Sequence, residues 1–480
     1  MDEMRWMDAT AVADAIAGGD VKASEVLDAT IERIESANPT LNAVVIDWFD
    51  RARDEAISVT GSPDAPLAGV PTLLKDLWAD LAGAPLTNGN RALRDAAPVS
   101  NFDSTLVERY RRAGLIIAGR TNSPELGSLP VTEPLAYGPT RNPWNTDHTP
   151  GGSSGGAAAA VAAGLVPIAH ASDGGGSIRI PASCCGLVGL KPSQGRITLG
   201  PARTESNLGV EHCVTRTVRD SALLLDLSAG PGIGDSVIAP APSARYVDEV
   251  GADPGVLRIG VLDHDPRGTP VDPVCAQAAN DTAGMLGSLG HQIDTSWPDA
   301  LADQTVSTWF MAQWATNMAV GIAAMGRGLG RELTEDEVEP VNWAMAQFAR
   351  NFSAVDLAES QAAVADYRRR VQAWWDAGWD LLVTPTVAQP PPRLGEHLAT
   401  DDDPMAGMKR AAEWVCFTSQ FNMTGQPAIS LPLAWTDDGL PIGVQLVAAY
   451  GREDLLIRVA SQLEAARPWA DRRPDVSAWT

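Results

Sequence analysis

Apolar residues recur at helical spacing in the first part of the chain. One such run would lie on a single helix face and comprises Val26, Leu27, Ile31 and Ile34. Asp8 and Ser24 precede runs of this kind and are predicted N-caps, because a short polar side chain at that position accepts a backbone N–H. The pattern predicts two or three helices over residues 8–58.

Chain-breaking residues divide this region further. Asn38-Pro39 is predicted to end a helix, since proline disrupts helical hydrogen bonding. The apolar run 41–46 predicts a strand, and residues 51–58 predict a further helix. Residues 103–119 predict a helix followed by a strand. Alternation of helices and strands favours an α/β protein.

A single lysine stands inside an apolar, β-prone run. Residues 67–77 would carry Lys75 into the interior. Burial disfavours an ammonium ion and lowers its pKa, so a buried Lys75 would be suited to act as a general base. Alternatively, Lys75 extends to solvent or pairs with Asp76 or Asp80, and the local pattern leaves both interpretations open.

Two clusters of glycine and serine form the most distinctive stretch. They span residues 151–156 and 174–177, and an alanine-rich predicted helix and a short predicted strand over 165–169 join them. Glycine permits close approach of backbone N–H groups, and a serine hydroxyl beside exposed amides supplies the nucleophile and the oxyanion donors that acyl transfer needs. For the second cluster, a tight turn capped by Ser177 is the alternative interpretation.

The first cluster also fits the pattern Gly-x-Ser-x-Gly around Ser153. In an α/β-hydrolase that pattern follows a strand, whereas residues 142–150 are rich in Pro, Asn and Thr and predict a loop. The candidate histidines stand in no distinctive context: His212, His264, His291 and His397. The stretch also lacks the lysine pattern of a phosphate-binding loop. The sequence therefore indicates neither an α/β-hydrolase nor a phosphate-binding loop.

Composition excludes several classes of partner. The 480 residues carry a formal net charge of -24 with a mean hydropathy of -0.07, so neither nucleic acid nor a membrane is an expected partner. The N-terminal stretch has no secretory pattern, which predicts a cytoplasmic protein. No metal site is predicted, because the five cysteines have no ligand spacing and are expected to fill the core: Cys184, Cys185, Cys213, Cys275 and Cys416.

Several segments together resemble the amidase signature family. The longest similarity runs through Gly152-Ser153-Ser154-Gly155-Gly156, Asp173-x-Gly175-Gly176-Ser177-Ile178-Arg179-x-Pro181 and Gly186-Leu187-Val188-Gly189-Leu190-Lys191-Pro192. Similar segments also occur around Lys75 and at residues 121–125, 426–432 and 439–445. The likeness therefore spans nearly the whole chain.

This resemblance implies a fold and a reaction. The fold would be one α/β domain over residues 1–480, with a single large mixed β-sheet sandwiched between helices. Its parts would be an N-terminal helical region, a catalytic core, a helical substrate-pocket segment and a C-terminal return to the core, at 1–65, 66–230, 298–421 and 422–480. The reaction would be amide hydrolysis through an acyl-enzyme and without a cofactor. Its Ser-cisSer-Lys triad would be Ser177 as nucleophile, Ser153 as bridging serine and Lys75 as base.

The same resemblance implies supporting roles. The oxyanion hole would consist of backbone N–H groups from Gly174, Gly175, Gly176 and Ser177, and the supporting side chains would be Asp173, Arg179 and Ser154. Two positions depart from the family: Gly174 stands where Thr or Ile is commoner, and Ser172 where Thr is usual. These departures would loosen the loop without removing a triad group.

The implied substrate is a small amide. Segment 298–421 is rich in tryptophan, and the predicted pocket walls are Trp309, Phe310 and Trp314. Residues 374–382 and 448–456 and the pair Glu211-His212 resemble the branch of the family that hydrolyses 6-aminohexanoate oligomers, cyclic or linear. An uncharged aliphatic amide is therefore expected.

Other substrates and functions remain alternatives within this resemblance. Aryl acylamides and carbamates are rival substrates. A glutaminyl-tRNA amidotransferase A subunit and an inactive binding protein are the remaining functions, and the negative charge argues against the first. A homodimer is the oligomeric state that the resemblance implies.

Overall fold

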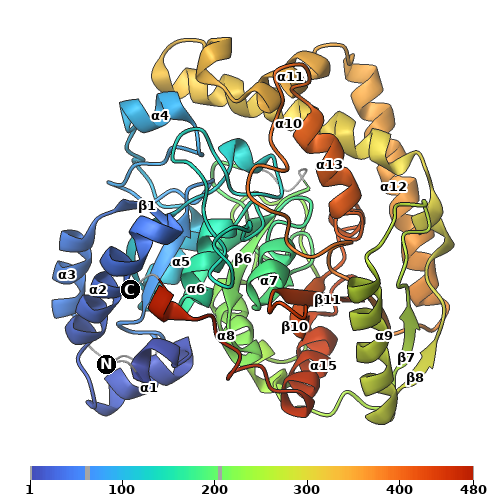
Figure 1. Ribbon diagram of the computed structural model, residues 1–480, viewed down its shortest axis with the longest axis horizontal. Coiled ribbons are helices and arrows are strands. Elements are labelled where there is room, and N and C mark those ends of the chain that lie inside the picture. Colours follow the sequence, from blue (N-terminus) through green and yellow to red (C-terminus); the bar gives the residue numbers. More distant parts are fainter. Residues whose placement is uncertain (1–2, 60–64, 204–207, 479–480) are drawn as a thin grey trace.

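The sheet crosses the whole molecule. The computed structural model describes residues 3–59, 65–203 and 208–478, and within them eleven strands form one mixed sheet in the order β1-β3-β2-β4-β6-β5-β10-β11-β9-β7-β8 (Figure 1). The strands are β1 (Val44–Asp47), β2 (Pro71–Lys75), β3 (Ile116–Thr121), β4 (Ile168–Asp173), β5 (Val188–Lys191), β6 (Val210–Thr215), β7 (Arg258–Val261), β8 (Gln292–Asp294), β9 (Leu381–Pro385), β10 (Ala428–Trp435) and β11 (Pro441–Ala448). The single large mixed sheet expected from the sequence is confirmed.

Strand direction brings two functional segments to one edge. β2 pairs in parallel with β3 and β4, and β7 pairs in parallel with β8 and β9, while the pairs between β4 and β9 are antiparallel. Thr72 of β2 lies opposite Ile168 of β4. The carboxyl ends of these parallel strands therefore meet, and they carry Lys75 and Ser172 toward each other.

Helices cover both faces of the sheet. They are α1 (Ala9–Gly18), α2 (Ala23–Leu41), α3 (Phe49–Ile57), α4 (Arg91–Ala96), α5 (Thr105–Arg112), α6 (Gly155–Ala162), α7 (Arg179–Cys185), α8 (Val218–Ser228), α9 (Pro273–Ser288), α10 (Val306–Leu329), α11 (Pro340–Ala349), α12 (Ala354–Asp376), α13 (Ala406–Trp414), α14 (Gln420–Met423) and α15 (Glu453–Ala466). Short 3-10 turns are η1 (Glu3–Trp6), η2 (Glu125–Gly127), η3 (Tyr246–Glu249), η4 (Asp299–Ala302), η5 (Glu335–Glu337) and η6 (Val476–Ala478).

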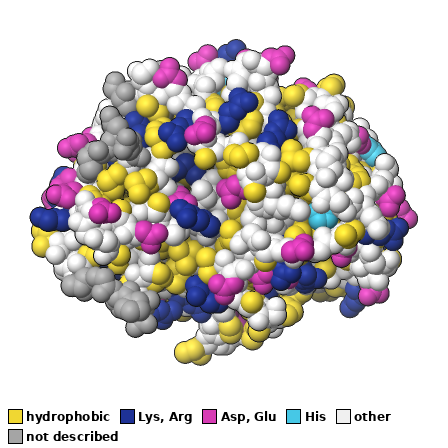
Figure 2. Space-filling view, turned by 90° about the horizontal axis from the view of Figure 1, so that it is seen from below, with side chains coloured by type: hydrophobic (Ala, Val, Ile, Leu, Met, Phe, Trp, Pro, Cys, Tyr) yellow, Lys and Arg dark blue, Asp and Glu magenta, His cyan; other side chains and the backbone are white. Residues whose placement is uncertain are grey.

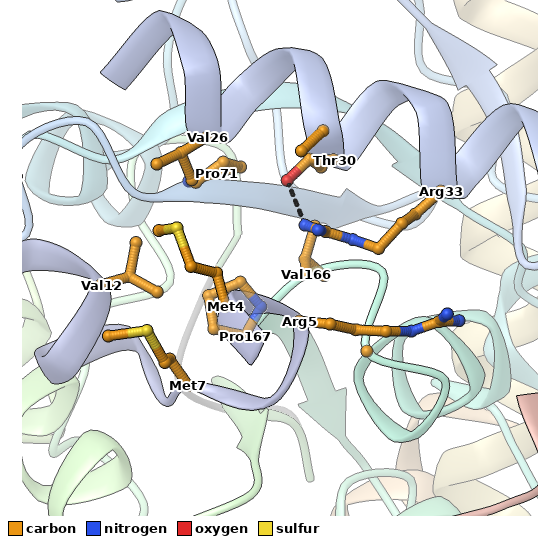
Figure 3. Close-up of a pocket in the computed structure, with 12 residues that line it drawn as sticks. Met4, Arg5, Met7, Val12, Val26, Thr30, Arg33, Pro71, Val166 and Pro167 are labelled. Carbon is orange, nitrogen blue, oxygen red and sulfur yellow. Dashed lines mark hydrogen bonds between the residues drawn. The ribbon is translucent and has the colours of Figure 1, made fainter. Parts of the chain in front are cut away.

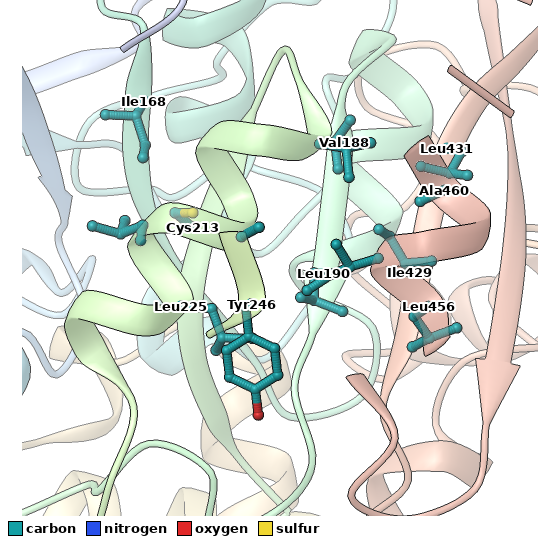
Figure 4. Close-up of a cluster of buried hydrophobic side chains, with 14 of the residues drawn as sticks. Ile168, Val188, Leu190, Cys213, Leu225, Tyr246, Ile429, Leu431, Leu456 and Ala460 are labelled. Carbon is teal, nitrogen blue, oxygen red and sulfur yellow. The ribbon is translucent and has the colours of Figure 1, made fainter. Parts of the chain in front are cut away.

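Each face of the sheet has its own apolar core. On one face the core includes side chains of α1, α5, α8, α9 and α15, and Figure 4 shows part of it, with Leu225 of α8 beside Tyr246 and Leu456 of α15 beside Ile429 of β10. On the other face the core includes side chains of α2, α3, α6, α7, α10 and α11. Burial of both faces of the sheet explains why strands such as β2 and β4 are buried along their whole length.

Some local predictions were wrong at element boundaries. Asn38-Pro39 does not end its helix, since α2 continues to Leu41. The proline lies in the last turn, with only two helical residues after it, and the Asn38 side chain accepts from the Ala43 and Val44 N–H groups just beyond the helix. Asp8 is the N-cap of α1, as predicted, but Lys22 rather than Ser24 stands at the N-cap of α2.

The strand predicted over 165–169 begins three residues later and extends four residues further. β4 spans Ile168–Asp173 because pairing with β6 keeps its polar end extended, with Ser172 opposite Glu211. Tertiary pairing here overrides the local preference of polar residues for a turn.

The N-terminal segment seals the edge of the core. Figure 3 shows Met4, Met7 and Val12 against Val26 of α2 and Pro71 at the start of β2. The gap between them holds only about 10 Å³, which is about the space of one water molecule. This seam is therefore packing and not a ligand site.

The surface has mixed charge on the face that Figure 2 shows, where acidic and basic side chains are interspersed among apolar ones. The helices among the described residues include none that is long and apolar enough to cross a bilayer. The five cysteines, predicted as core residues, are all buried and unpaired with one another, and no group of His, Cys, Asp and Glu in the described chain could hold a metal ion.

Candidate active site

Lys75 ends β2 with its ammonium group wholly inside the protein. Its Nζ lies 2.7 Å from Ser153 Oγ and 3.0 Å from Ser172 Oγ. Burial lowers the pKa of Lys75 to about 7, against the opposing effect of the Glu211 and Asp173 carboxylates. Of the two interpretations left open by the sequence, the structure favours the buried one, because the side chain does not reach solvent and its Nζ contacts Ser153 and Ser172 and forms no ion pair with Asp76 or Asp80.

The first serine cluster holds two serines against the end of β4. The Gly152–Ser153 peptide bond is cis, as the family resemblance implied. Ser154 Oγ donates to the Ser172 carbonyl at 3.2 Å and accepts from the Ser172 N–H at 3.3 Å. α6 then begins at Gly155. This cluster is thus attached to β4 beside Lys75.

The second cluster is a turn between β4 and α7 that Asp173 and Arg179 hold. Asp173 accepts from the Gly176 N–H at 2.7 Å and the Ile178 N–H at 3.1 Å, and it pairs with Arg179 through two nitrogens at 3.0 Å each. Burial would raise the pKa of Asp173, but the Arg179 guanidinium holds that pKa well below its usual range. The supporting contacts predicted for these two side chains are present.

One of the four predicted oxyanion amides is already occupied. Because the Gly176 N–H donates to Asp173, the amides of Gly174, Gly175 and Ser177 are the ones left to face a ligand. Gly176 itself must be glycine: its φ is +136°, and a Cβ there would come within 2.5 Å of both Ile180 and Thr418.

Aromatic side chains of α10 explain the departure at Gly174. Phe310 and Trp314 stack with ring centroids 5.2 Å apart, and a Cβ on Gly174 would lie 3.1 Å from the Trp314 ring. The indole therefore occupies the space that a larger side chain at this position would use. Trp309 points elsewhere and packs edge-on against Tyr367 of α12, so the structure brings two of the three predicted pocket aromatics to the site.

Two cavities meet at Ser177. One holds about 320 Å³ and is mostly apolar; it is lined by Phe310, Met311, Trp314, Val415 and Met423 among others. The second holds about 350 Å³ and is lined by Trp78, Ser153, Ser172, Arg203, Asn317 and Arg327 among others. Ser177, Gly127 and Trp314 line both. A ligand at Ser177 thus has room on two sides, as an amide with an acyl and an amine part requires.

The structure also brings in residues that the sequence analysis missed. His170 of β4 accepts from the Lys75 N–H, and Arg203, before β6, lines the second cavity. Glu211, which contacts His170, had been noted only as part of a similar segment. A histidine inside an otherwise small and apolar strand was the available signal for His170. Nothing local marked Arg203.

The fold and site are those of an amidase. The family model described as Amidase matches residues 25–457, so the chain belongs to the amidase family. Enzymes of this class hydrolyse carbon–nitrogen bonds other than peptide bonds, and the chain is a hydrolase of this kind.

Beyond the family match, the chain is similar to individual amidases. The chain is 44% identical to the 6-aminohexanoate-cyclic-dimer hydrolase of Paenarthrobacter ureafaciens, over 98% of this chain and 97% of that protein. A solved structure of 6-aminohexanoate cyclic dimer hydrolase complexed with substrate superposes with a TM-score of 0.95 at 43% identity, covering 98% and 99% of the two chains. A bacterial aryl acylamidase of the amidase signature family follows with a TM-score of 0.88 at 29% identity, covering 99% of each.

Proposed function

We propose that this amidase hydrolyses 6-aminohexanoate oligomers, with the cyclic dimer as the preferred substrate, through a Ser177 acyl-enzyme. The observation that carries the proposal is the 2.7 Å contact between the buried Lys75 Nζ and Ser153 Oγ, in a cavity that Ser177 shares. The similarity to cyclic-dimer hydrolases over nearly the full chain supports the choice of substrate.

The proposed reaction begins with proton transfer. Neutral Lys75 accepts a proton from Ser153 Oγ, which in turn accepts the proton of Ser177 Oγ. The Ser177 oxygen bonds to the amide carbon, and negative charge develops on the carbonyl oxygen. The amides of Gly174, Gly175 and Ser177, which are left when Gly176 donates to Asp173, would donate to that charge.

Collapse of the tetrahedral intermediate breaks the carbon–nitrogen bond. The leaving nitrogen takes back the proton through Ser153 from Lys75, so the amine departs neutral and Ser177 carries the acyl group. Water then attacks the ester with the same groups as base and acid, which releases the carboxylic acid and restores the serine. For a cyclic dimer both halves of the product belong to one linear molecule, so the two cavities at Ser177 would hold its two ends.

A hydrolysis panel with the purified full chain tests the proposal. The substrates are the cyclic dimer, the linear dimer, an anilide and a carbamate, and wild type is compared with Ser177→Ala. We expect the cyclic dimer to give the highest kcat/KM, and Ser177→Ala to lose at least about 1,000-fold in kcat while keeping wild-type thermal stability. Hydrolysis by Ser177→Ala at a wild-type rate contradicts the nucleophile, and a preference for the anilide contradicts the substrate.

Aryl acylamide hydrolysis is the second candidate. The stacked Phe310 and Trp314 rings in the apolar cavity favour it, because an aromatic acyl or amine group would stack there. The cytoplasmic location and the homodimer inferred from the sequence stay predictions.

A further inference from the structure

A histidine on the neighbouring strand β4 contacts the backbone of the lysine. The Lys75 backbone N–H donates to His170 Nδ1 at 3.2 Å, so Nδ1 carries no proton. His170 Nε2 lies 2.7 Å from Glu211 Oε2 and must be the protonated nitrogen that donates to it. Burial lowers the pKa of His170, in agreement with a neutral ring. The backbone of Lys75 is thereby linked to a carboxylate on β6.

That carboxylate is buried and balanced by an arginine at the cavity wall. Glu211 accepts from Arg203 Nη1 through its second oxygen. Burial would raise the pKa of Glu211, but Arg203 and His170 hold it below its usual value, so Glu211 is charged. The Arg203 guanidinium lies 4.4 Å from the centre of the Trp78 ring, and both side chains line the second cavity. Trp78 has a φ of +65°, a strained conformation for a bulky residue.

We propose that Arg203, Glu211 and His170 are positioning residues for Lys75: His170 fixes its backbone, and the opposed charges of Glu211 and Arg203 set its strength as a base. This inference rests on the proposed function, in which Lys75 accepts the serine proton. Glu211 favours the protonated lysine that forms as Ser177 attacks, and Arg203 limits that effect so that Lys75 is neutral often enough to start the reaction.

The other charges around Lys75 have partners of their own. Asp173 is paired with Arg179, and the Asp76 carboxylate accepts from Thr87 and Gly89. Arg120 donates to the carbonyls of Pro85 and Lys75. The charges that act on the Lys75 ammonium are those of Glu211, Asp173 and Arg203. Asp173 and Arg203 line the second cavity, but Asp173 is held by Arg179, whereas Arg203 pairs with Glu211, which contacts His170 beside the lysine backbone.

The test measures the pH at which the proposed base Lys75 loses its proton, without an amide substrate. Phenylmethylsulfonyl fluoride modifies an activated serine: the Ser177 oxygen bonds to sulfur, fluoride leaves, and the proton passes to Lys75. The rate of this modification between pH 5 and 9, followed by mass spectrometry on the full chain, gives the pH midpoint of the base. Hydrolysis rates measured over the same range provide the second readout.

Two single variants should move the midpoint in opposite directions. Glu211→Gln removes the negative charge, and we expect the midpoint to fall by about one pH unit and kcat to fall with little change in KM. Arg203→Gln removes the positive charge, and we expect the midpoint to rise by about one unit. The double variant should return close to wild type, and Glu211→Asp, which keeps the charge, should stay within about half a unit of it.

Glu453→Gln is the matched control. Glu453 is also a buried carboxylate with an arginine partner, Arg196, but it lies outside both cavities. We expect its midpoint to equal that of wild type even if its stability falls. A role in folding alone would lower the amount of active enzyme without moving the midpoint, and circular dichroism of each variant shows which chains are folded.

Several results would overturn the inference. They are an unmoved midpoint in folded Glu211→Gln, a shift of Arg203→Gln in the same direction as Glu211→Gln, or an equal shift in Glu453→Gln. If Glu211→Gln does not fold, the midpoint of Arg203→Gln alone tests the inference. Arg203 lies at the cavity wall, so its replacement is less disruptive to folding. Failure of wild type to react at Ser177 contradicts the proposed function instead, so the two failures are distinguishable.

Discussion

Replacing Asp173 by asparagine tests how the loop before Ser177 is held. The substitution keeps the shape of the side chain and removes its charge. Asp173 accepts hydrogen bonds from Gly176 N, Ile178 N, two Arg179 nitrogens and Asn422 Nδ2, at 2.7 to 3.1 Å. In the variant one oxygen becomes an NH2 group that faces donors, and the fully buried Arg179 loses its counter-charge.

The expected cost follows from that burial. Removing one partner of a buried ion pair costs about 3–5 kcal/mol. Arg179 keeps acceptors in Gln445, Asn422 and Thr418, which favours the lower end of the range. Because a domain is stable by about 5–15 kcal/mol, Asp173→Asn should fold with a clearly reduced free energy of unfolding and at least about tenfold lower kcat.

Urea unfolding and initial rates measure both effects. Asp303→Asn is the control, since its pair with Arg370 at 2.8 Å is partly exposed and should contribute less than about 1 kcal/mol. The double variant Asp173→Asn/Arg179→Gln should cost less than the sum of the single changes, because it leaves no unpaired buried charge. A loss below about 1 kcal/mol in Asp173→Asn would refute the reasoning.

Three further predictions concern the base, a buried acid and the aromatic wall. The hydrolysis rate should rise about tenfold per pH unit up to about pH 7 and then level, because only neutral Lys75 accepts a proton; Lys75→Met should lose the activity, and a flat profile between pH 5.5 and 8 contradicts this. Burial and the neighbouring Glu125 raise the pKa of Glu339 to about 8. As the pH rises, the unfolded chain loses this proton before the folded chain does. Glu339 therefore lowers the free energy of unfolding of wild type by about 1.4 kcal/mol per pH unit between pH 4.5 and 8. Urea unfolding at pH 6 and 8 should therefore show Glu339→Gln gaining about 2 kcal/mol over wild type across that interval, and a constant difference would argue against it. Gly174→Thr should displace the Trp314 ring and raise KM several-fold, and Gly174→Thr/Trp314→Ala should bind better than Gly174→Thr alone; equal KM values for wild type and Gly174→Thr would contradict this packing.

The sequence was most informative in the glycine- and serine-rich segments around Ser153 and Ser177. The cis bond at Ser153 and the glycine turn before Ser177 follow from segments whose residues are specific to one family, and the family match confirms that resemblance. The burial of Lys75 was one of two interpretations, because an apolar run does not show which side chains from other segments contact the lysine in the folded protein. The structure supplies Ser153 and Ser172, from a different part of the chain.

The sequence by itself determined the amidase family and the mixed α/β sheet, and it is the source of the predicted triad, because these depend on short segments with few acceptable alternatives. Only the tertiary structure decided that Gly176 donates to Asp173, that Trp314 and not Trp309 faces the cavity, and that Glu211 lies behind the base. Each of these depends on contacts between residues far apart in the chain. Packing and desolvation fix such contacts only when the strands and helices assemble, so no local pattern encodes them.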